Sequence, residues 1–515
     1  MKDNIFIYLV FNDPKWIELI DLFCKRSNLT PSFIGSIPQL HQKFKAVYPN
    51  AFLYNCCKWL DGLSITDLQK TPDQAITIEE LNFLNQYSNT IQNNFLRYDS
   101  FNEITYDKYF IFYYNLMVFW KRLLIYFKPK CIFFSTTPHH FDELILYYLA
   151  QFYTIKTIVL ESFQVNNTYY TCIKNDYSKN ILFQNHISVA SLIKTTHLKN
   201  NVESFIKNTR DSKSYQKPFF EISKMKIKKS IRHKIRDSEL YQFFFLNYLH
   251  RYLAIKNGML YFHKPPSKIK HFKHKINVYI QSILNKMHYK ELASKKLDFE
   301  QPYIYVALHL LPEETASPMG ALFTDQFLMI NLLSKSIPAG WKLYVKEHPS
   351  TFGKLSHVTF ANRPLSIISH KKHFYHDIDK LKNTHLVPID TDSYTLIDHA
   401  KAVATLTGTV GIESVLRNTP VLAFGYAWYR SCPGVFGIEK TADIKQALKK
   451  IMNGYTPPIE DVCNYLHQIE KEYPKGAHGF SNSPTFNFDS YFPNLSAETI
   501  IKNLSKSITK NILHE

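Results

Sequence analysis

The chain has 515 residues, of which 45% are hydrophobic and 15% aromatic, and it carries a formal net charge of +19. This composition excludes disorder over most of the chain, and the length suits two or three domains. The charge favours an anionic partner, such as nucleic acid, an anionic membrane surface, a nucleotide sugar or a lipid-linked phosphate.

The cysteines and the apolar runs indicate a compartment. The seven cysteines are scattered, with no CxxC pair and no metal-ligand spacing, which favours a reducing compartment over a disulfide framework. Residues 5–11 are apolar, but this run is too short for the core of a signal peptide. No stretch approaches the roughly 20 apolar residues of a membrane span. We therefore expect a cytoplasmic protein, with peripheral attachment at the inner face of the plasma membrane as a further option.

The first 220 residues predict an open parallel sheet. Short apolar runs are typical of strands buried on both faces, and here they alternate with helical patterns. The predicted elements are strand 5–11, helix 16–24, strand 131–134, helix 141–152 and strand 157–160, which ends at Glu161. Because the last three form a βαβ unit, residues 1–220 are expected to form a Rossmann-like domain.

The middle of the chain, residues 221–297, is basic and rich in aromatic residues. Seven lysines and arginines lie between Lys224 and Arg236, and a second basic tract covers residues 263–275. One interpretation is a solvated helical face with a linker. The other is a helical insertion whose residues 224–275 contact anionic lipid headgroups or a phosphorylated acceptor. Since no nucleic-acid module accompanies these tracts, we do not expect nucleic acid as the partner.

Alternating strands and helices resume over residues 298–480, and a helical tail is expected over residues 481–515. The predicted strands are 303–309, 341–346, 385–389, 402–406 and 420–424, and the predicted helices are 325–336, 393–400 and 409–417. The fold class is therefore α/β, with two doubly wound, Rossmann-like domains and a basic helical insertion between them. Such domains bind ligands at the carboxyl ends of their strands, so we expect the site in a cleft between them.

Thr407, Gly408 and Thr409 stand where a predicted strand ends and a helix begins. Free backbone N–H groups at a helix start attract anions, and small residues let a phosphate approach the backbone. The alternative is a well-capped tight turn, which is the commoner role of such a triplet. Glu413 lies in the first helical turn, where a carboxylate is favourable in any case, and it could also accept from ribose hydroxyls.

The motif Lys346-Glu347-His348-Pro349 follows another predicted strand. Proline favours an extended backbone at the residue before it, which would project the His348 ring from the strand end. A histidine in that place can donate to a phosphate oxygen. The alternative is a surface histidine in a turn.

Asp390 and Asp392 resemble a DxD metal motif. Two carboxylates alone make a weak magnesium site, whereas an aspartate before a helix is a common cap. We therefore prefer Asp392 or Ser393 as the start of the next helix, and we expect no metal.

Together, several stretches resemble glycosyltransferases of bacterial capsule and surface-polysaccharide biosynthesis, a group that includes the Kdo transferases with a GT-B fold. The order and spacing of these stretches over roughly 130 residues are more specific than any single motif. The stretches are 303–309, Pro312-Glu313, Ser317-Pro318, 341–350, 404–413 and 424–429, with a weaker likeness over 135–161.

The resemblance implies that the first domain binds the acceptor and the second binds a nucleotide-sugar donor. It implies that His348 contacts the donor phosphate and that Thr407 and Thr409 hold a phosphate or a donor carboxylate. The full set of implied donor-site residues is Glu313, Lys346, His348, Thr407, Gly408, Thr409 and Glu413. Several relatives use CMP-activated ulosonic acids such as Kdo, and enzymes of this kind generally work without a metal or another cofactor.

Acidic and imidazole side chains in the first half of the chain are candidates for the catalytic residues of glycosyl transfer. His140 and Glu143 follow the strand at 131–134, and Glu161 ends the next strand. Glycosyl transfer needs a carboxylate or an imidazole to take the proton of the acceptor or to stabilise the oxocarbenium-like centre. We therefore take these three residues as catalytic candidates, although each alone is more often structural.

The predicted function is transfer of a sugar, with CMP-Kdo as the favoured donor, to a glycan or lipid-linked acceptor in capsule or lipopolysaccharide biosynthesis. Where relatives tend to carry a basic residue, this chain has Glu314, and that departure bears on the donor. Enzymes that could use the same anion sites are a UDP-sugar transferase, an epimerase and a CDP-polyol phosphotransferase. A non-catalytic subunit that binds glycan or membrane is the alternative from another class.

Overall fold

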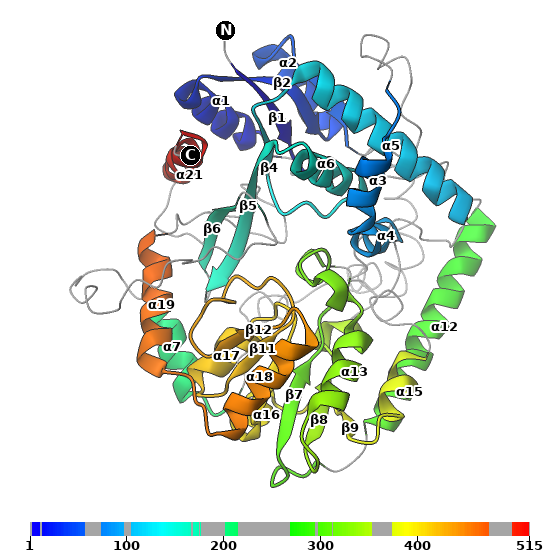
Figure 1. Ribbon diagram of the computed structural model, residues 1–515, viewed down its shortest axis with the longest axis vertical. Coiled ribbons are helices and arrows are strands. Elements are labelled where there is room, and N and C mark those ends of the chain that lie inside the picture. Colours follow the sequence, from blue (N-terminus) through cyan, green and yellow to red (C-terminus); the bar gives the residue numbers. More distant parts are fainter. Residues whose placement is uncertain are drawn as a thin grey trace, which may run out of the picture. The chain divides into compact units, whose positions relative to one another are not determined.

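The computed structural model describes residues 3–10, 13–56, 74–96, 105–165, 168–174, 176, 201–214, 268–293, 297–311, 313–352, 373–472 and 497–513. Most of the basic segment expected to contact lipid or acceptor, residues 224–267, lies outside these ranges. The described residues form two compact units, each built around one six-stranded sheet (Figure 1). None of the helices in the described ranges is both long enough and apolar enough to span a bilayer.

The first unit has the strand order β3-β2-β1-β4-β5-β6, in which β6 alone runs antiparallel to its neighbour. Its elements are β1 (Asp3–Tyr8), α1 (Lys15–Ser27), β2 (Leu29–Ser36), α2 (Pro38–Val47), β3 (Phe52–Asn55), α3 (Ile78–Asn85), α4 (Ser88–Leu96), α5 (Tyr106–Phe127), β4 (Cys131–Phe134), α6 (Phe141–Phe152), β5 (Lys156–Val165), β6 (Thr168–Lys174) and α21 (Ala497–Leu513). Because β2 and β3 lie on one side of β1 and β4 to β6 lie on the other, this is a doubly wound sheet.

The core of the first unit explains its apolar strands. Helices cover both faces of a doubly wound sheet, so its central strands have no solvated side. Accordingly Ile5, Phe6 and Ile7 in β1 are all fully buried. The C-terminal helix α21 packs against α1 with apolar residues at helical spacing, among them Ile500 and Leu504. Helix α21 lies within the range expected for a helical tail, residues 481–515, and it is part of the first unit.

The second unit repeats the topology with the order β12-β11-β10-β7-β8-β9, all parallel. Its elements are α7 (Asn201–Asp211), α12 (Lys268–Leu292), β7 (Tyr303–Ala307), the 3-10 turn η6 (Ala321–Thr324), α13 (Gln326–Ser336), β8 (Lys342–Lys346), the 3-10 turn η7 (Pro349–Phe352), α15 (Phe374–Asp379), β9 (Thr384–Val387), α16 (Ser393–His399), β10 (Ala402–Thr405), α17 (Val410–Leu416), β11 (Val421–Ala423), β12 (Val435–Gly437), α18 (Thr441–Met452) and α19 (Ile459–Glu472). The expected α/β class with two doubly wound, Rossmann-like sheets is confirmed.

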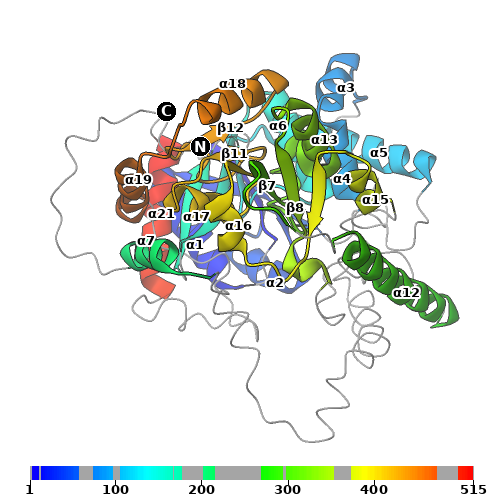
Figure 2. The same cartoon turned by 90° about the horizontal axis from the view of Figure 1, so that it is seen from below.

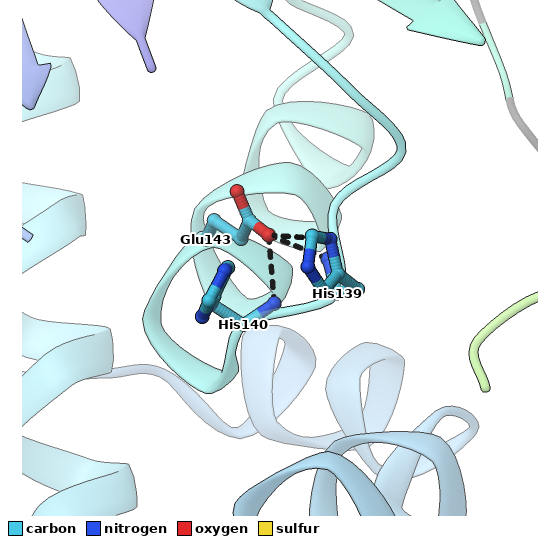
Figure 3. A group of neighbouring side chains, drawn as sticks. All are labelled: His139, His140 and Glu143. Carbon is cyan, nitrogen blue, oxygen red and sulfur yellow. Dashed lines mark hydrogen bonds and ion pairs between the residues drawn. The ribbon is translucent and has the colours of Figure 1, made fainter. Parts of the chain in front are cut away.

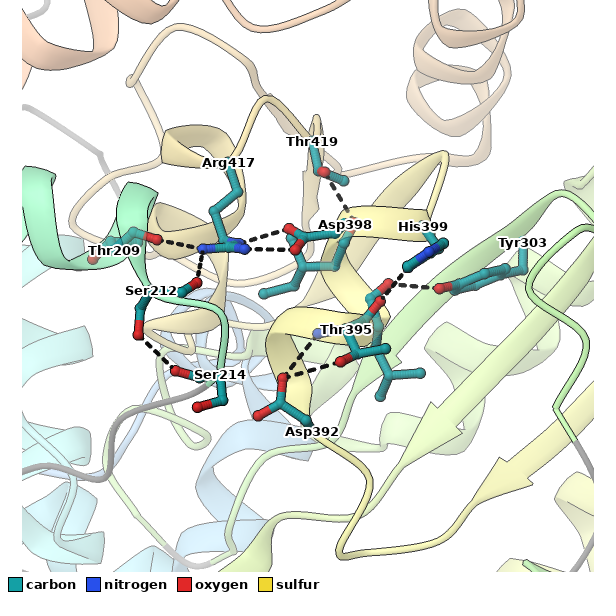
Figure 4. Close-up of polar contacts among 12 residues, drawn as sticks. Thr209, Ser212, Ser214, Tyr303, Asp392, Thr395, Asp398, His399, Arg417 and Thr419 are labelled. Atoms are coloured by element: carbon teal, nitrogen blue, oxygen red, sulfur yellow. Dashed lines mark hydrogen bonds and ion pairs between the residues drawn. The ribbon is translucent and has the colours of Figure 1, made fainter.

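Helix α7 packs in the second unit, although we expected residues up to 220 in the first domain. It lies against α17, where the Arg417 guanidinium donates to the backbone carbonyls of Thr209 (2.5 Å) and Ser212 (3.1 Å) (Figure 4). Two further guanidinium nitrogens of Arg417 donate to the Asp398 carboxylate, at 2.6 and 2.5 Å. The sequence of α7 shows an amphipathic helix but not which sheet it covers, and this is why the expected boundary differs.

Replacing Arg417 by alanine should loosen α7. The change removes two hydrogen bonds from a cation to carbonyls that hold the helix, and such bonds stabilise by about 2 kcal/mol each when partly buried. We expect a lower free energy of unfolding in urea and faster proteolysis within residues 201–214. Lys401→Ala, an exposed cation of the same unit, is the control, and equal proteolysis of the two variants would contradict the role of Arg417.

Candidate functional site

The switch points of the two sheets are where ligands of doubly wound folds bind. In the second unit, the chain leaves β7 towards β8 and β9, and leaves β10 towards β11 and β12. The crevice between the carboxyl ends of β7 and β10 is therefore a switch point. The corresponding position in the first unit lies between β1 and β4.

His309 and Thr407 meet at the switch point of the second unit. His309 follows β7 and Thr407 follows β10, and the Nε2 atom of His309 lies 3.3 Å from the Thr407 amide and 3.1 Å from its hydroxyl. The Gln326 side chain fixes the His309 backbone by accepting from its N–H (2.6 Å) and donating to its carbonyl (3.0 Å). His309 lies in one of the stretches that carry the family resemblance, but the sequence alone did not indicate it as a site residue.

His309 is held neutral. Burial lowers its pKa to about 3, and the neighbouring His348 lowers the pKa in the same direction. Because Nε2 accepts from the Thr407 amide, the proton of the neutral ring lies on Nδ1. This buried Nδ1 has no hydrogen-bond partner among the described residues. His309 is therefore a neutral ring rather than a cation at the switch point, and its buried Nδ1–H is an unsatisfied donor within the described ranges.

The three residues of the expected anion-binding turn, residues 407–409, differ in their exposure to solvent. Thr407 is buried and its hydroxyl donates to the Thr315 carbonyl (2.7 Å), whereas Gly408 is half-buried and Thr409 is exposed. A side chain at Gly408 would crowd its neighbours, because a Cβ atom there would lie 3.0 Å from Thr405 Oγ1 and 3.5 Å from His309 Nε2. Glycine thus keeps the loop close to His309. Donor contacts of these three residues stay predictions.

Glu413, a further expected donor contact, points into the protein interior. It is buried, and burial raises its pKa to about 7 against the opposing effect of Arg417. Its charge in turn contributes to the raised pKa values of Tyr305, Tyr394 and Tyr429, so it lies among these phenols. Contact of Glu413 with a donor ribose stays a prediction.

Glu413 should make stability depend on pH. Its pKa is about 7 in the folded protein and 4.5 ordinarily, so folding favours the protonated form. The stability that the neutral carboxyl contributes is complete below pH 4.5 and is lost as the pH rises through 7. Relative to wild type, Glu413→Gln should therefore gain stability from pH 5 to 8, by at most about 3 kcal/mol. Urea unfolding across this range measures it. Glu313→Gln, at an exposed carboxylate, should show no such gain, and parallel curves for wild type and Glu413→Gln would contradict the prediction.

Lys346 and Asp392 hold the turn before α16. The ammonium group of Lys346 donates to the Thr391 carbonyl (2.5 Å) and the Ser393 hydroxyl (3.0 Å). Burial lowers its pKa to about 8, although Asp392 and Asp390 raise it. Asp392 is the N-cap of α16 and accepts from the Thr395 amide at 2.9 Å. Asp392 therefore caps α16, as expected, and the absence of a metal at Asp390 and Asp392 stays a prediction.

His348 is positioned by the carboxylate that precedes it. Glu347 is buried and accepts from the His348 amide (2.7 Å), the Thr351 hydroxyl (3.0 Å) and the Tyr375 phenol (2.6 Å). The Nδ1 atom of the half-buried His348 ring accepts from the Ser350 amide at 3.2 Å, so Nε2 carries the proton. Glu347 is therefore a positioning residue, a role that its place in the sequence did not indicate.

Glu313 is an exposed residue of the loop after β7. Its backbone carbonyl accepts from the Ala316 and Ser317 amides at 3.0 Å each, which shapes the turn. Its carboxylate lies 3.4 Å from the Thr315 hydroxyl. Contact between Glu313 and the donor stays a prediction.

In the first unit, His140 and Glu143 lie together at the start of α6 (Figure 3). Oε1 of Glu143 accepts from the backbone amides of His139 (2.6 Å) and His140 (2.7 Å), so this carboxylate caps the helix. Potential metal-ligand atoms of His139, His140 and Glu143 lie within 4.8 Å of one another, so among the described residues this group could hold a metal ion. Capping already accounts for Glu143, and its catalytic role stays a prediction.

Glu161 does not end its strand, contrary to expectation. Strand β5 continues to Val165 because the antiparallel strand β6 pairs with it, and Glu161 stands opposite Cys172 in the middle of this pairing. Its carboxylate forms a buried ion pair with Lys174 of β6. Burial alone would lower the pKa of Lys174, but Glu161 raises it. The antiparallel partner, which the sequence pattern did not reveal, therefore places Glu161 inside the sheet.

Asp142 is a buried acid in the first unit that sequence analysis did not select. One carboxylate oxygen accepts from the phenols of Tyr8 (2.5 Å) and Tyr54 (3.1 Å), and the Trp120 indole donates to the Asp142 carbonyl (2.9 Å). Burial raises the pKa of Asp142 to about 7, although both phenols lower it. Asp142 thus ties the ends of β1 and β3 to α6.

Comparison with protein families gives one match. A model of the family described as "Capsule polysaccharide biosynthesis protein" matches residues 195–451, which include the whole sheet of the second unit. A comparison with curated protein sequences found no match.

Solved structures give remote similarities. Two are from Thermosulfurimonas dismutans: "KpsC, beta Kdo 2,7 transferase" (14% identity, TM-score 0.21, 37% of this chain and 63% of that chain) and "KpsC, beta Kdo 2,4 transferase" (10%, 0.24, 66% and 87%). A third is a UDP-GlcNAc 2-epimerase from Neisseria meningitidis bound to UDP-GlcNAc (10%, 0.22, 98% and 100%). The first match spans less than two thirds of its transferase. At such TM-scores none of them carries an argument about function.

Proposed function

Because the chain belongs, through residues 195–451, to the family of capsule polysaccharide biosynthesis proteins, we propose that it is a glycosyltransferase that moves a sugar from a nucleotide donor to a surface glycan. The observation that carries the proposal is the contact of His309 with Thr407 at the switch point of the second sheet, close to His348. Ligands of doubly wound sheets bind in this crevice.

The groups at this switch point are suited to an anionic donor. The Nε2–H of His348 can donate to a phosphate oxygen, and the Nδ1–H of His309 is a buried donor whose satisfaction by an acceptor would be favourable. Both rings donate without needing to be charged, so binding would not depend on protonation of His309. We propose a CMP-activated ulosonic acid such as Kdo as the donor, because its phosphate and its carboxylate both need N–H or O–H donors.

The first unit would supply the acceptor side. We propose that His140, Glu143 or Glu161 takes the proton from the acceptor hydroxyl, and that the acceptor is a glycan or a lipid-linked oligosaccharide. We further propose that the protein works in the cytoplasm, at the inner face of the plasma membrane. The basic segment over residues 224–275 would contact the anionic surface of that membrane.

Donor hydrolysis tests the proposal. The purified full-length protein would be incubated with CMP-, UDP-, GDP- and CDP-activated compounds, with and without EDTA, and nucleotide release would be followed. We expect release from CMP-Kdo that EDTA does not affect. Absence of turnover together with absence of a thermal shift by any nucleotide would refute the proposal that the protein is an enzyme. Turnover of another donor would change the assignment of the donor and leave the proposed reaction class intact.

A further inference from the structure

Helix α12 carries a row of exposed apolar side chains. Six of them are between 38% and 71% exposed, and they are Ile269, Phe272, Ile276, Ile280, Ile283 and Met287. Since each residue of a helix turns by about 100°, these six fall within an arc of about 80°. Single exposed apolar residues are ordinary, but a continuous row along a helix of 25 residues marks an interaction surface.

The other side of α12 is anchored in the second unit. Asn285, Tyr289 and Ala293 are buried at helical spacing. The Tyr289 phenol donates to the Val387 carbonyl (2.5 Å) and accepts from the Glu347 amide (3.1 Å), and its ring lies 5.0 Å from that of Tyr375. Figure 2 shows one end of the helix beside α15 and the other extending beyond its unit. The helix is thus anchored in its unit by one side, and the exposed apolar row lies on another side.

Lysines border the apolar row. Lys273, Lys286 and Lys290 are exposed, and helical geometry places Lys273 on one edge of the row and the other two on the opposite edge. The sequence of α12 contains six lysines and a single acidic residue, Glu291. A lysine can reach lipid phosphates with its ammonium group while its carbon chain follows the apolar strip into the interface. We propose that α12 docks in the plane of an anionic lipid surface, with the apolar row in the acyl boundary.

The same charge pattern disfavours two other binding partners for the apolar row, a second copy of the protein and nucleic acid. A second copy packed on this row by a two-fold axis would bring lysines of one helix against lysines of the other. Nucleic acid would neutralise the lysines but would leave the apolar row in water. An anionic bilayer satisfies both features, and this inference does not depend on the proposed enzymatic function.

Vesicle co-sedimentation of the full-length protein tests the proposal. The probes are vesicles of mixed phosphatidylcholine and phosphatidylglycerol, with pure phosphatidylcholine as the neutral comparison. We expect binding to the mixed vesicles that falls steeply as salt is raised. The double variant Ile280→Asp with Met287→Asp should bind at least about tenfold more weakly, because two carboxylates enter the apolar strip. Lys286→Glu with Lys290→Glu should lose about fivefold or more per lysine.

Met452→Asp is the matched control. Met452 is 54% exposed, close to the 59% of Met287, but it ends α18 and lies outside the row. It should bind vesicles like wild type, and all variants should keep the wild-type unfolding temperature. Equal binding by wild type and the Ile280/Met287 variant would overturn the proposal. So would absence of vesicle binding, or a wild-type dimer in sedimentation that this variant converts to monomer, since the row would then join two copies.

Discussion

The rate of donor turnover should fall by about two to three orders of magnitude when His348 is replaced by alanine. The ring is half-buried, and its Nδ1 atom is fixed by the Ser350 amide so that Nε2–H can face a ligand. The anchoring contacts of this loop belong to Glu347, which the variant keeps. The unfolding temperature should therefore stay at the wild-type value. Nucleotide release and thermal unfolding measure the two effects.

His399→Ala is the matched control for this variant. His399 is an exposed histidine of the same unit, at the end of α16, and its loss should change neither quantity. A large fall in unfolding temperature for His348→Ala would mark His348 as structural, and normal turnover would remove it from the site. At His309, Gln keeps an acceptor for the Thr407 amide, so His309→Gln should retain more turnover than His309→Leu.

Replacing Glu161 by glutamine should destabilise the first unit by about 3–5 kcal/mol. The change removes the carboxylate that pairs with the buried Lys174 and leaves Asp176 as a remaining negative charge that acts on it. Lys174→Met should be destabilising for the same reason. Urea unfolding of both single variants measures the effect, and a cost near zero would show that the ion pair does not hold these strands.

The double variant Glu161→Gln with Lys174→Met separates structure from catalysis. Removing both charges should recover much of the stability that either single change loses, because no unpaired charge remains buried. Recovery of donor turnover together with stability would assign Glu161 a structural role. A stable double variant without turnover would instead support Glu161 as the catalytic carboxylate.

Strands and helices with strong apolar patterns were predictable to within a few residues. The strand at 131–134 and the helix at 141–152 coincide with β4 and α6, because continuous apolar runs and a clear helix start mark both. Strand β6 escaped prediction, since antiparallel pairing with β5 depends on a partner that the local pattern does not name. The unit to which α7 belongs escaped for a similar reason. Its amphipathic pattern indicates that one face of the helix is buried, but it does not indicate which helix that face packs against.

The places of the candidate site residues were more predictable than their contacts. Strand-end motifs placed them in the loops after β8 and β10, because parallel strands of one sheet bring their carboxyl ends to one edge, and their role in donor binding stays a prediction. The pairing of His309 with Thr407 links residues that are 98 positions apart, so only the strand order β7 next to β10 reveals it. Likewise, nothing in the sequence shows that Lys346 is engaged by the turn before α16, or that Glu413 is enclosed by phenols.

The packing of α21 on α1 makes the first unit discontinuous in sequence. During synthesis, the residues of α21 leave the ribosome after those of the second unit. Until then α1 lacks the helix that packs against it in the finished core. The second unit can therefore fold before the first unit is complete, which reverses the usual order of co-translational folding. A fragment that ends before residue 497 would keep every strand of both sheets and still expose an apolar face on α1.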